Sequence, residues 1–582
     1  MPVAYTKPGR RPLQIFGLDP MLARTERRQL TMEIANEALE PGPQGSRVQV
    51  IDYDGATKTL YQPVDLDDPA VLMTDGLSPS EADPRFHQQM VYAVAMKTLE
   101  NFERALGRKL RFSRGKRLRI FPHAFEGANA YYDPSNVALL FGYFRADEEN
   151  PGPNLPGQTV FTCLSHDIIA HETTHALVDR LRPRFIDASN HDVLAFHEGF
   201  SDIVAIFQHF SFREVLADSI QKTRSDLRNH TALVELASQF GYSTGSGKAL
   251  RDAVDTATGG KPDPTQIQTL LEPHDRGSIL VAAVFEAFFN VYQRRIRDLI
   301  RIATGGTGVL PAGDLHPDLV NRIAGEASKT AQNVLTMCIR AFEYLPPVDI
   351  TFGDYLRAVV TADYEMVPED DVGLRAAMIE AFRVRGIYPD GVLSLAEDSL
   401  FWPAPEKELV LPFKPFEQRL VENARSFDQW GRTMADSDSG TAMRRWAVQL
   451  VGWARENSAA LGLDAKHDIA LLGFHTVFRV SPNGQLMVEL VAQFEQKDES
   501  SDADAAFGGV PFRGGTTVIA GAEGKVHFII RKPLTPARRE KQRHFVTALD
   551  ATDVALAWCD ETYLTKRMRL RTNFAALHRG VM

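Results

Sequence analysis

The stretch that most constrains this chain is Ser165 to Asp179, SHDIIAHETTHALVD, which the pattern predicts as one helix. No Pro or Gly interrupts it, Ser165 is a plausible N-cap, and Pro183 follows where a helix would end. Residues four apart lie on the same face of a helix, so His171 and His175 should point to one side. Two imidazoles placed in this way can approach a single metal ion.

The segment also carries an acid at the position that metal chemistry needs. His171, Glu172 and His175 match the H-E-x-x-H pattern, in which both His bind zinc and the Glu takes a proton from metal-bound water. A match by chance is expected on the order of 0.03 times in a chain of this composition. The alternative is a buried helix with two hydrogen-bonded core histidines.

A third ligand is expected from the next acidic cluster. A catalytic zinc ion usually has three protein ligands and one open position. Glu198 lies 23 residues after His175, inside the apolar segment 193–210, which predicts a second helix packed antiparallel to the first. Glu198 and Asp202 share a face of that helix, so Glu198 can bind the metal while Asp202 holds the outer N–H of a ligating His. The alternative is a pair of acids on the helix surface.

These residues, D-x-x-x-H-E-x-x-H-A-x-x-D followed by E-x-x-S-D, resemble the thermolysin-like gluzincin metallopeptidases. The resemblance covers roughly residues 84–390. It implies an α+β multidomain protein with a two-lobed metallopeptidase, in which a mixed β/α lobe precedes a helical lobe. It also implies a zinc-dependent endopeptidase with one catalytic Zn²⁺ and a peptide or protein as substrate.

Four further positions acquire roles through the resemblance. Asn129 and Ala130 begin a segment like the family's edge strand, which pairs with the substrate backbone. Arg251 stands where the family has an Arg that binds a substrate carbonyl. His274 stands where the family has the His that stabilises the oxyanion. The alternatives are a turn residue at Asn129, a surface ion pair at Arg251 and a helix cap at His274.

The chain departs from the family pattern at three points. The gap from His175 to Glu198 is three residues longer than usual, and Ser189 replaces a Tyr that assists the oxyanion in the family. His209 replaces a calcium-binding acid, and Asp167 alone does not make a calcium site because Ca²⁺ needs about six to eight oxygens. Calcium is therefore not predicted.

Length and composition divide the chain into several parts. We expect a β-rich first lobe at 1–160, a helical zinc-binding lobe at 161–390, a Pro-punctuated linker at 391–416, and an α+β accessory domain at 417–582. Within the last part, the runs IALLGFHTVFRV and QLMVELVAQF predict a hairpin. This domain matches no family pattern, and a protein partner could bind through it.

Charge and hydropathy restrict partners and location. The formal net charge of −10 argues against a nucleic-acid binder, and no apolar run reaches the roughly 18 residues of a membrane span. The N-terminus lacks the apolar core of a signal peptide, and three distant cysteines argue against a disulfide framework. A cytoplasmic location is expected, with non-classical export left open.

Two other functions remain open from the sequence. One is a catalytically weak or inactive zinc-bound scaffold that acts through residues 417–582, which the missing Tyr favours and the intact Glu172 opposes. The other is an aminopeptidase-type hydrolase with the same metal triad. Residues 126–130, EGANA, lack the Gly-x-Met-Glu-Asn segment that exopeptidases on such a scaffold use to bind a substrate amino terminus.

Overall fold

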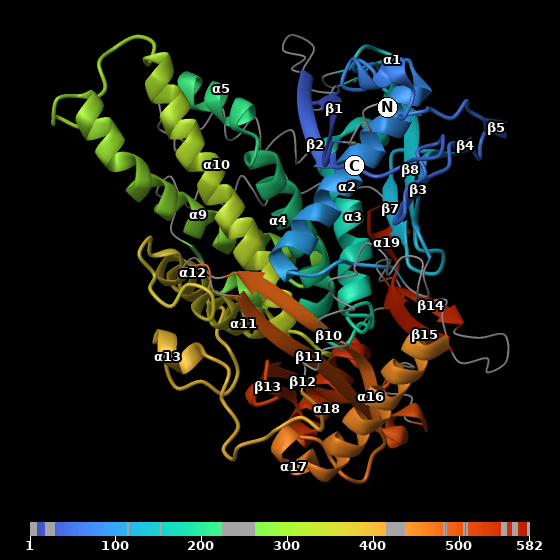
Figure 1. The fold of residues 1–582 in the computed structure, drawn as a ribbon, viewed down its shortest axis with the longest axis vertical. Helices are drawn as coiled ribbons and strands as arrows, with labels where there is room; N and C mark the ends of the chain where they lie inside the picture. The colour runs from blue at the N-terminus through green and yellow to red at the C-terminus, as the bar shows by residue number, and fades with distance from the viewer. Residues whose placement is uncertain are drawn as a thin grey trace, which may run out of the picture.

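The fold is a mixed α+β assembly of several layers (Figure 1), seen in a computed structural model of the chain. The structure describes residues 8–17, 29–112, 116–149, 151, 154–223, 262–414, 437–480, 484, 486–503, 507, 510–548, 556–560 and 568–578. Among these residues, none of the helices combines the length and the apolar character needed to cross a membrane.

The first lobe is organised around one long buried helix, α2 (Pro84–Leu106). Asp83 caps it by accepting a hydrogen bond from the Arg85 N–H, Pro84 pre-sets the first turn, and Gly107 ends it in the left-handed region at φ 66°. Around α2 lie the antiparallel pair β1 (Arg10–Phe16) and β2 (Gln29–Ala35) and a five-stranded sheet.

The five-stranded sheet ends in an edge strand beside the helical lobe. Its order is β3 (Val48–Val50), β6 (Leu118–Glu126), β8 (Ala138–Arg145) and β7 (Ala130–Asp133), and β9 (Thr159–Phe161) pairs with part of β8. Within the described part of the chain, β7 pairs with β8 alone, so its outer side faces no strand. The short pair β4 (Tyr53–Asp54) and β5 (Thr59–Leu60) extends from this lobe.

Two buried helices lie between the lobes, at the centre of Figure 1: α3 (His166–Leu181) and α4 (His191–Phe210). Ser165 caps α3 by accepting from the Ile168 N–H, and Asn190 caps α4 by accepting from two N–H groups. Both predicted helices, and the Ser165 cap, are confirmed. Helices α5 (Arg213–Thr223), α9 (Pro273–Ala303), α10 (Pro317–Arg340), α11 (Phe352–Tyr364) and α12 (Leu374–Arg383) complete the helical lobe.

Helices α4 and α9 approach closely at a pair of glycines. A Cβ atom on Gly199 would lie 2.6 Å from the Gly277 carbonyl oxygen, and one on Gly277 would lie 2.9 Å from the Ala195 carbonyl oxygen. The absence of both side chains lets the two helices cross at backbone distance. This crossing brings Glu198, one residue before Gly199, toward the N-terminus of α9, where His274 lies.

We expect Gly199→Ala to separate these two helices and destabilise the protein by about 1–3 kcal/mol, since the added methyl group overpacks the crossing. Thermal unfolding measures the loss. Gly452→Ala is the matched control, because Gly452 lies in α16 (Ser437–Glu456) with open space around it and should gain about 0.5–1 kcal/mol. Equal effects of the two substitutions would contradict the close crossing.

The C-terminal part contains a four-stranded antiparallel sheet, β10 (Ile469–Val480), β11 (Leu486–Lys497), β12 (Arg513–Gly521) and β13 (Val526–Lys532). The predicted hairpin is β10–β11 and is confirmed. The same part holds α16, α18 (Pro536–Ala548), the pair β14 (Leu556–Asp560) and β15 (Met568–Thr572), and α19 (Phe574–Leu577). Short helices elsewhere are α1 (Pro69–Leu72), α8 (Gln266–Thr269), α13 (Glu397–Leu400) and α17 (Ser458–Leu461).

This sheet is buried on both faces. Val491 and Ile519 belong to the main hydrophobic core of the molecule, whereas their strand neighbours Leu490 and Val518 belong to a second core beside α16. Side chains alternate between the faces of a strand, which explains the division. Ion pairs join the same sheet to the helical lobe, as between Arg184 Nη2 and Glu495 Oε1 at 2.7 Å.

The segment predicted as a linker also contacts the C-terminal sheet. Val410 forms a β-bridge with Lys525, and the Leu411 N–H donates to the Gly524 carbonyl oxygen.

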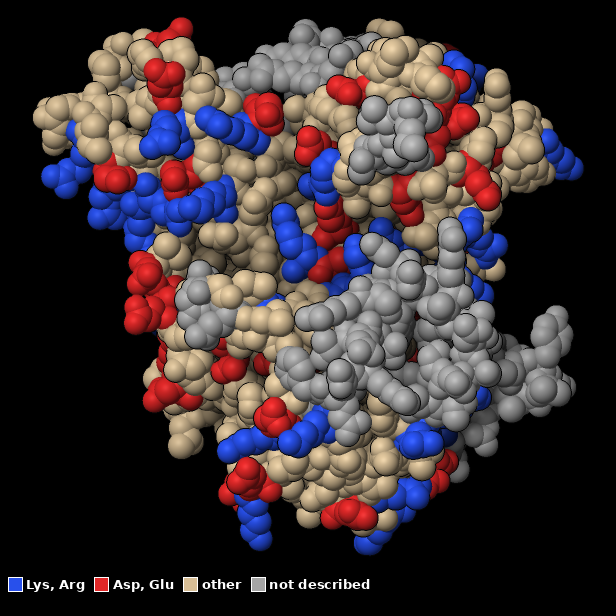
Figure 2. All heavy atoms as spheres, in the orientation of Figure 1, with Lys and Arg blue, Asp and Glu red and all other residues tan. Residues whose placement is uncertain are grey.

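On the molecular face in Figure 2, acidic and basic side chains are interspersed, and Lys and Arg gather over α9 and α10.

Candidate metal centre

Two histidines on one face of α3 form the base of the site. His171 and His175 are one helical turn apart, and their Nε2 atoms lie 2.9 Å from one another. Both side chains are buried, so solvent satisfies neither nitrogen. Two imidazole nitrogens that face each other at this distance need either a shared proton or a cation between them.

Glu198 of α4 joins the two histidines from the opposite helix. Its Oε2 lies 3.3 Å from His171 Nε2, and its Oε1 lies 3.6 Å from His175 Nε2. The three side chains expected to hold a metal therefore converge, although Glu198 and His175 are 23 residues apart in the sequence.

The outer nitrogens of both imidazoles are held by polar side chains. His171 Nδ1 donates to Asp202 Oδ1 at 2.8 Å, so the structure places Asp202 where a partner to a ligating His was expected. His175 Nδ1 lies 3.2 Å from Ser201 Oγ. With Nδ1 as the donor, the neutral form of His171 has its lone pair on Nε2, which is the tautomer that binds a metal through that atom.

The electrostatics of this cluster favour positive charge. Burial on its own would lower the pKa of His171, but hydrogen bonds with Asp202 and Glu198, together with their charges, raise it to about 10. Burial lowers the pKa of His175 well below its usual value. Burial would raise the pKa of Glu198, yet the surrounding imidazoles hold it well below its usual range. A buried carboxylate among imidazoles suits a divalent cation.

Glu172 lies next to these ligands and is fully buried. Neither carboxylate oxygen accepts a hydrogen bond from the described residues. Buried carboxylates are normally hydrogen-bonded, so this one needs water, substrate or a cation nearby. His171, Glu172 and His175 place ligand atoms within 4.8 Å of one another.

His274 approaches from the first turn of α9. Its Nδ1 donates to Glu272 Oε1 at 2.9 Å, and its Nε2 lies 3.5 Å from Glu198 Oε2. Burial would lower the pKa of His274, but the charge of Glu198 and the hydrogen bond to Glu272 raise it. His274 therefore lies at the site, and the N-cap of α9 is Glu272 rather than His274.

The two expected substrate-edge residues lie at the start of β7, and both already have partners from the far end of the chain. The Asn129 Nδ2 donates to the Ala575 carbonyl oxygen at 2.9 Å. The Ala130 carbonyl oxygen accepts from His578 Nδ1, also at 2.9 Å. Arg251 lies outside the described residues.

His578 is the residue of this site that the sequence did not indicate. Its Nε2 lies 3.4 Å from Glu198 Oε2, and its Nδ1 lies 3.1 Å from Glu172 Oε1. No spacing rule could have found it, because 380 residues separate it from Glu198. A lone His near the end of a chain carries no local signal, and only packing brings it here.

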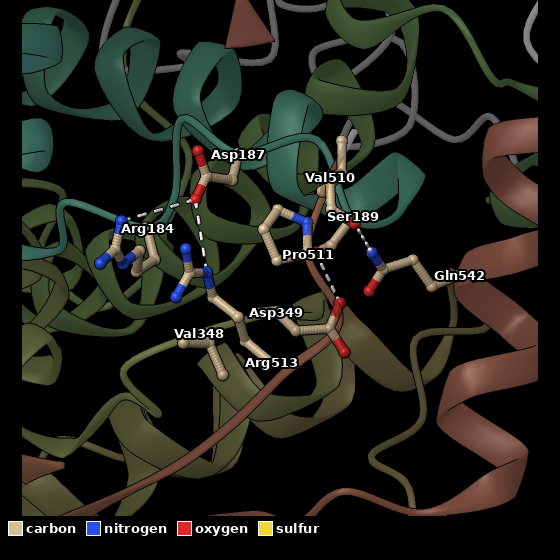
Figure 3. A pocket seen from close by; sticks show the side chains of 9 residues that line it. All are labelled: Arg184, Asp187, Ser189, Val348, Asp349, Val510, Pro511, Arg513 and Gln542. Atoms are coloured by element: carbon tan, nitrogen blue, oxygen red, sulfur yellow. Dashed lines mark hydrogen bonds and ion pairs between the residues drawn. The ribbon is translucent and has the colours of Figure 1, made fainter. Parts of the chain in front are cut away.

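Ser189, at the position where the family has a Tyr, contacts a different part of the molecule. Ser189 Oγ donates to Asp349 Oδ1 at 2.7 Å, and both line a small pocket against Pro511, Arg513 and Gln542 (Figure 3). The neighbouring Asn190 caps α4 and also donates to Asp349. The residues that line this pocket do not include His171, His175 or Glu198.

Two other buried groups contain several possible ligands, but they are better satisfied by protein atoms. His123 contacts Asp52 through Nδ1 at 2.6 Å and His87 through Nε2 at 2.8 Å, next to Cys163. In the second group, Asp167 Oδ1 accepts from His166 and from His209, which stands at the position of the family's calcium ligand.

The donor set around His171 fits a transition metal better than the other two groups do. It combines the imidazoles of His171, His175 and His578 with the Glu172 carboxylate, which accepts no hydrogen bond from the described residues. Imidazole with one carboxylate is a ligand set that zinc uses in hydrolytic enzymes, whereas Ca²⁺ and Mg²⁺ prefer oxygen alone.

No protein-family model matches this chain, and no curated protein matches it either.

Proposed function

We propose that this protein is a thermolysin-like zinc endopeptidase. One observation supports this above all: His171, His175 and Glu198 converge from two helices while Glu172 stands beside them with neither oxygen hydrogen-bonded by the described residues. A structural cluster would be expected to satisfy the Glu172 carboxylate internally. A hydrolytic site needs that carboxylate free to take up a proton.

His171, His175 and Glu198 would hold the zinc ion, and Asp202 would fix the orientation and tautomer of His171. Bound zinc would polarise a substrate carbonyl and lower the pKa of a coordinated water from about 15.7 toward about 7. Glu172 would accept the proton of the attacking water and deliver it to the leaving amine.

His274 would stabilise the charge that develops on the attacked carbonyl oxygen. Its Nδ1 proton is held by Glu272, so Nε2 must carry a second proton to donate toward substrate. The raised pKa of His274 favours this doubly protonated form. The outer side of β7 would supply backbone groups for an extended peptide, since β7 pairs with β8 alone among the described strands.

Metal analysis joined to a protease assay tests this function. We expect about one zinc ion per chain, cleavage of internal bonds in an unbiased peptide mixture, and loss of cleavage with a chelator. Removal of amino-terminal residues alone would favour the aminopeptidase. A zinc-loaded protein that cleaves nothing would favour the scaffold.

A further inference from the structure

The C-terminal segment Thr572–His578 lies on the metal centre of its own chain. The N–H and Oγ1 of Thr572 both contact the Ile186 carbonyl oxygen, at 3.1 and 3.2 Å, in the loop that joins α3 to α4. From there, α19 runs beside β7 and α3, away from the sheet β10–β13 (Figure 1). The chain thus returns to the first lobe after leaving its C-terminal sheet.

This segment occupies the edge that a peptide substrate would use. Ala575 accepts from the Asn129 side chain, and His578 donates to the Ala130 carbonyl oxygen. An extended peptide that pairs with the outer side of β7 needs that same carbonyl oxygen. The segment and such a peptide therefore exclude one another.

The contact also has an apolar anchor. The Phe574 ring lies 4.5 Å from the His175 ring and 5.3 Å from the His197 ring, measured between centroids, and it is 1 % exposed. Leu577, on the same helical turn, is also buried. Burial of this aromatic ring against His175 stabilises the docked position of the segment without any metal.

His578 is oriented as a metal ligand. The Ala130 carbonyl oxygen can only accept, so His578 Nδ1 carries a proton, and the neutral form of the ring then has its lone pair on Nε2. That Nε2 points to Glu198, as the Nε2 atoms of His171 and His175 do. A ligating His commonly donates its outer N–H to a carbonyl or carboxylate, which His171 does with Asp202.

We propose that His578 is a fourth protein ligand to the metal, carried by a C-terminal segment that closes the peptide site of its own chain. This inference rests on the zinc site proposed above. A catalytic zinc ion needs one position open to water, and His578 fills that position while the segment is docked. Substrate binding then requires the segment to leave, so only the undocked fraction of the protein is active.

X-ray absorption at the zinc edge tests the ligand assignment by counting imidazoles. We expect three in the wild-type protein and two in His578→Ala. His544→Ala is the matched control, since His544 is an exposed residue of the same part of the chain, and it should keep three. Two imidazoles in the wild-type protein would overturn the proposal.

A metal-directed peptide hydroxamate tests displacement in the unaltered chain, so a misfolded variant cannot obscure the result. Its addition should lower the imidazole count from three to two, and an unchanged count with hydroxamate bound to zinc would contradict a displaceable His578. Phe574→Ala, which keeps His578 but removes the anchor, should lower the count as well.

Turnover distinguishes this inference from the proposed function. His578→Ala and Phe574→Ala should raise kcat/KM about tenfold or more, because the docked fraction is inactive. Zinc with unchanged or lower turnover in these variants would overturn the closing role and leave the peptidase intact. Absence of zinc from the wild-type protein would overturn both the proposed peptidase and the closing role of the segment. If the protein holds zinc but neither it nor any variant cleaves peptides, the peptidase proposal fails, and the closing role fails with it.

Discussion

Replacement of Glu172 by Gln is expected to leave the zinc content intact and lower kcat by about a thousandfold, within the range that general acid–base catalysis usually contributes. Gln has the same shape as Glu but cannot take up a proton near neutral pH. Because Glu172 is fully buried with neither oxygen hydrogen-bonded by the described residues, the substitution breaks no hydrogen bond to them. Single-turnover kinetics joined to metal analysis measures the two effects separately.

Glu380→Gln is the control for this substitution. Glu380 is an exposed residue of α12 that pairs with Arg383 three residues on, so its replacement should change neither zinc content nor kcat. A Glu172→Gln variant with near-normal kcat would remove Glu172 as the base. A variant that loses zinc would instead make Glu172 part of the metal-holding set.

The elements that could be predicted from the sequence are those whose signals are local. Helix α2 begins at an Asp-Pro pair and ends at a Gly, and α3 begins at a Ser with no breaker in its interior. His171 and His175 are four residues apart, so helix geometry alone puts them together. Glu198 followed because one short connection between two helices makes them antiparallel neighbours.

What could not be predicted depends on packing between distant segments. The strands β10–β13 carry apolar residues on both faces, so the sequence cannot tell which face meets the main core. Likewise, the sequence around Phe574 and His578 does not predict a contact with residues about 400 positions earlier. Such contacts are decided by the surfaces left free once the lobes have formed.

Glu198→Ala is expected to cost more than about a hundredfold in zinc affinity, because even the loss of a partner behind a ligand costs about ten- to a hundredfold. The substitution removes a carboxylate that contacts both His171 and His175. It also removes the charge that offsets a buried divalent cation. Competition for zinc with a chromophoric chelator measures the affinity.

Asp202→Asn supplies the graded comparison. Its amide can still accept from the His171 Nδ1–H but lacks the negative charge of the carboxylate, so zinc should bind with a smaller loss, at most about a hundredfold. If Glu198→Ala binds zinc as tightly as the wild-type protein, Glu198 is not a ligand. The three imidazoles of His171, His175 and His578 would then hold the ion and leave its fourth position open to water.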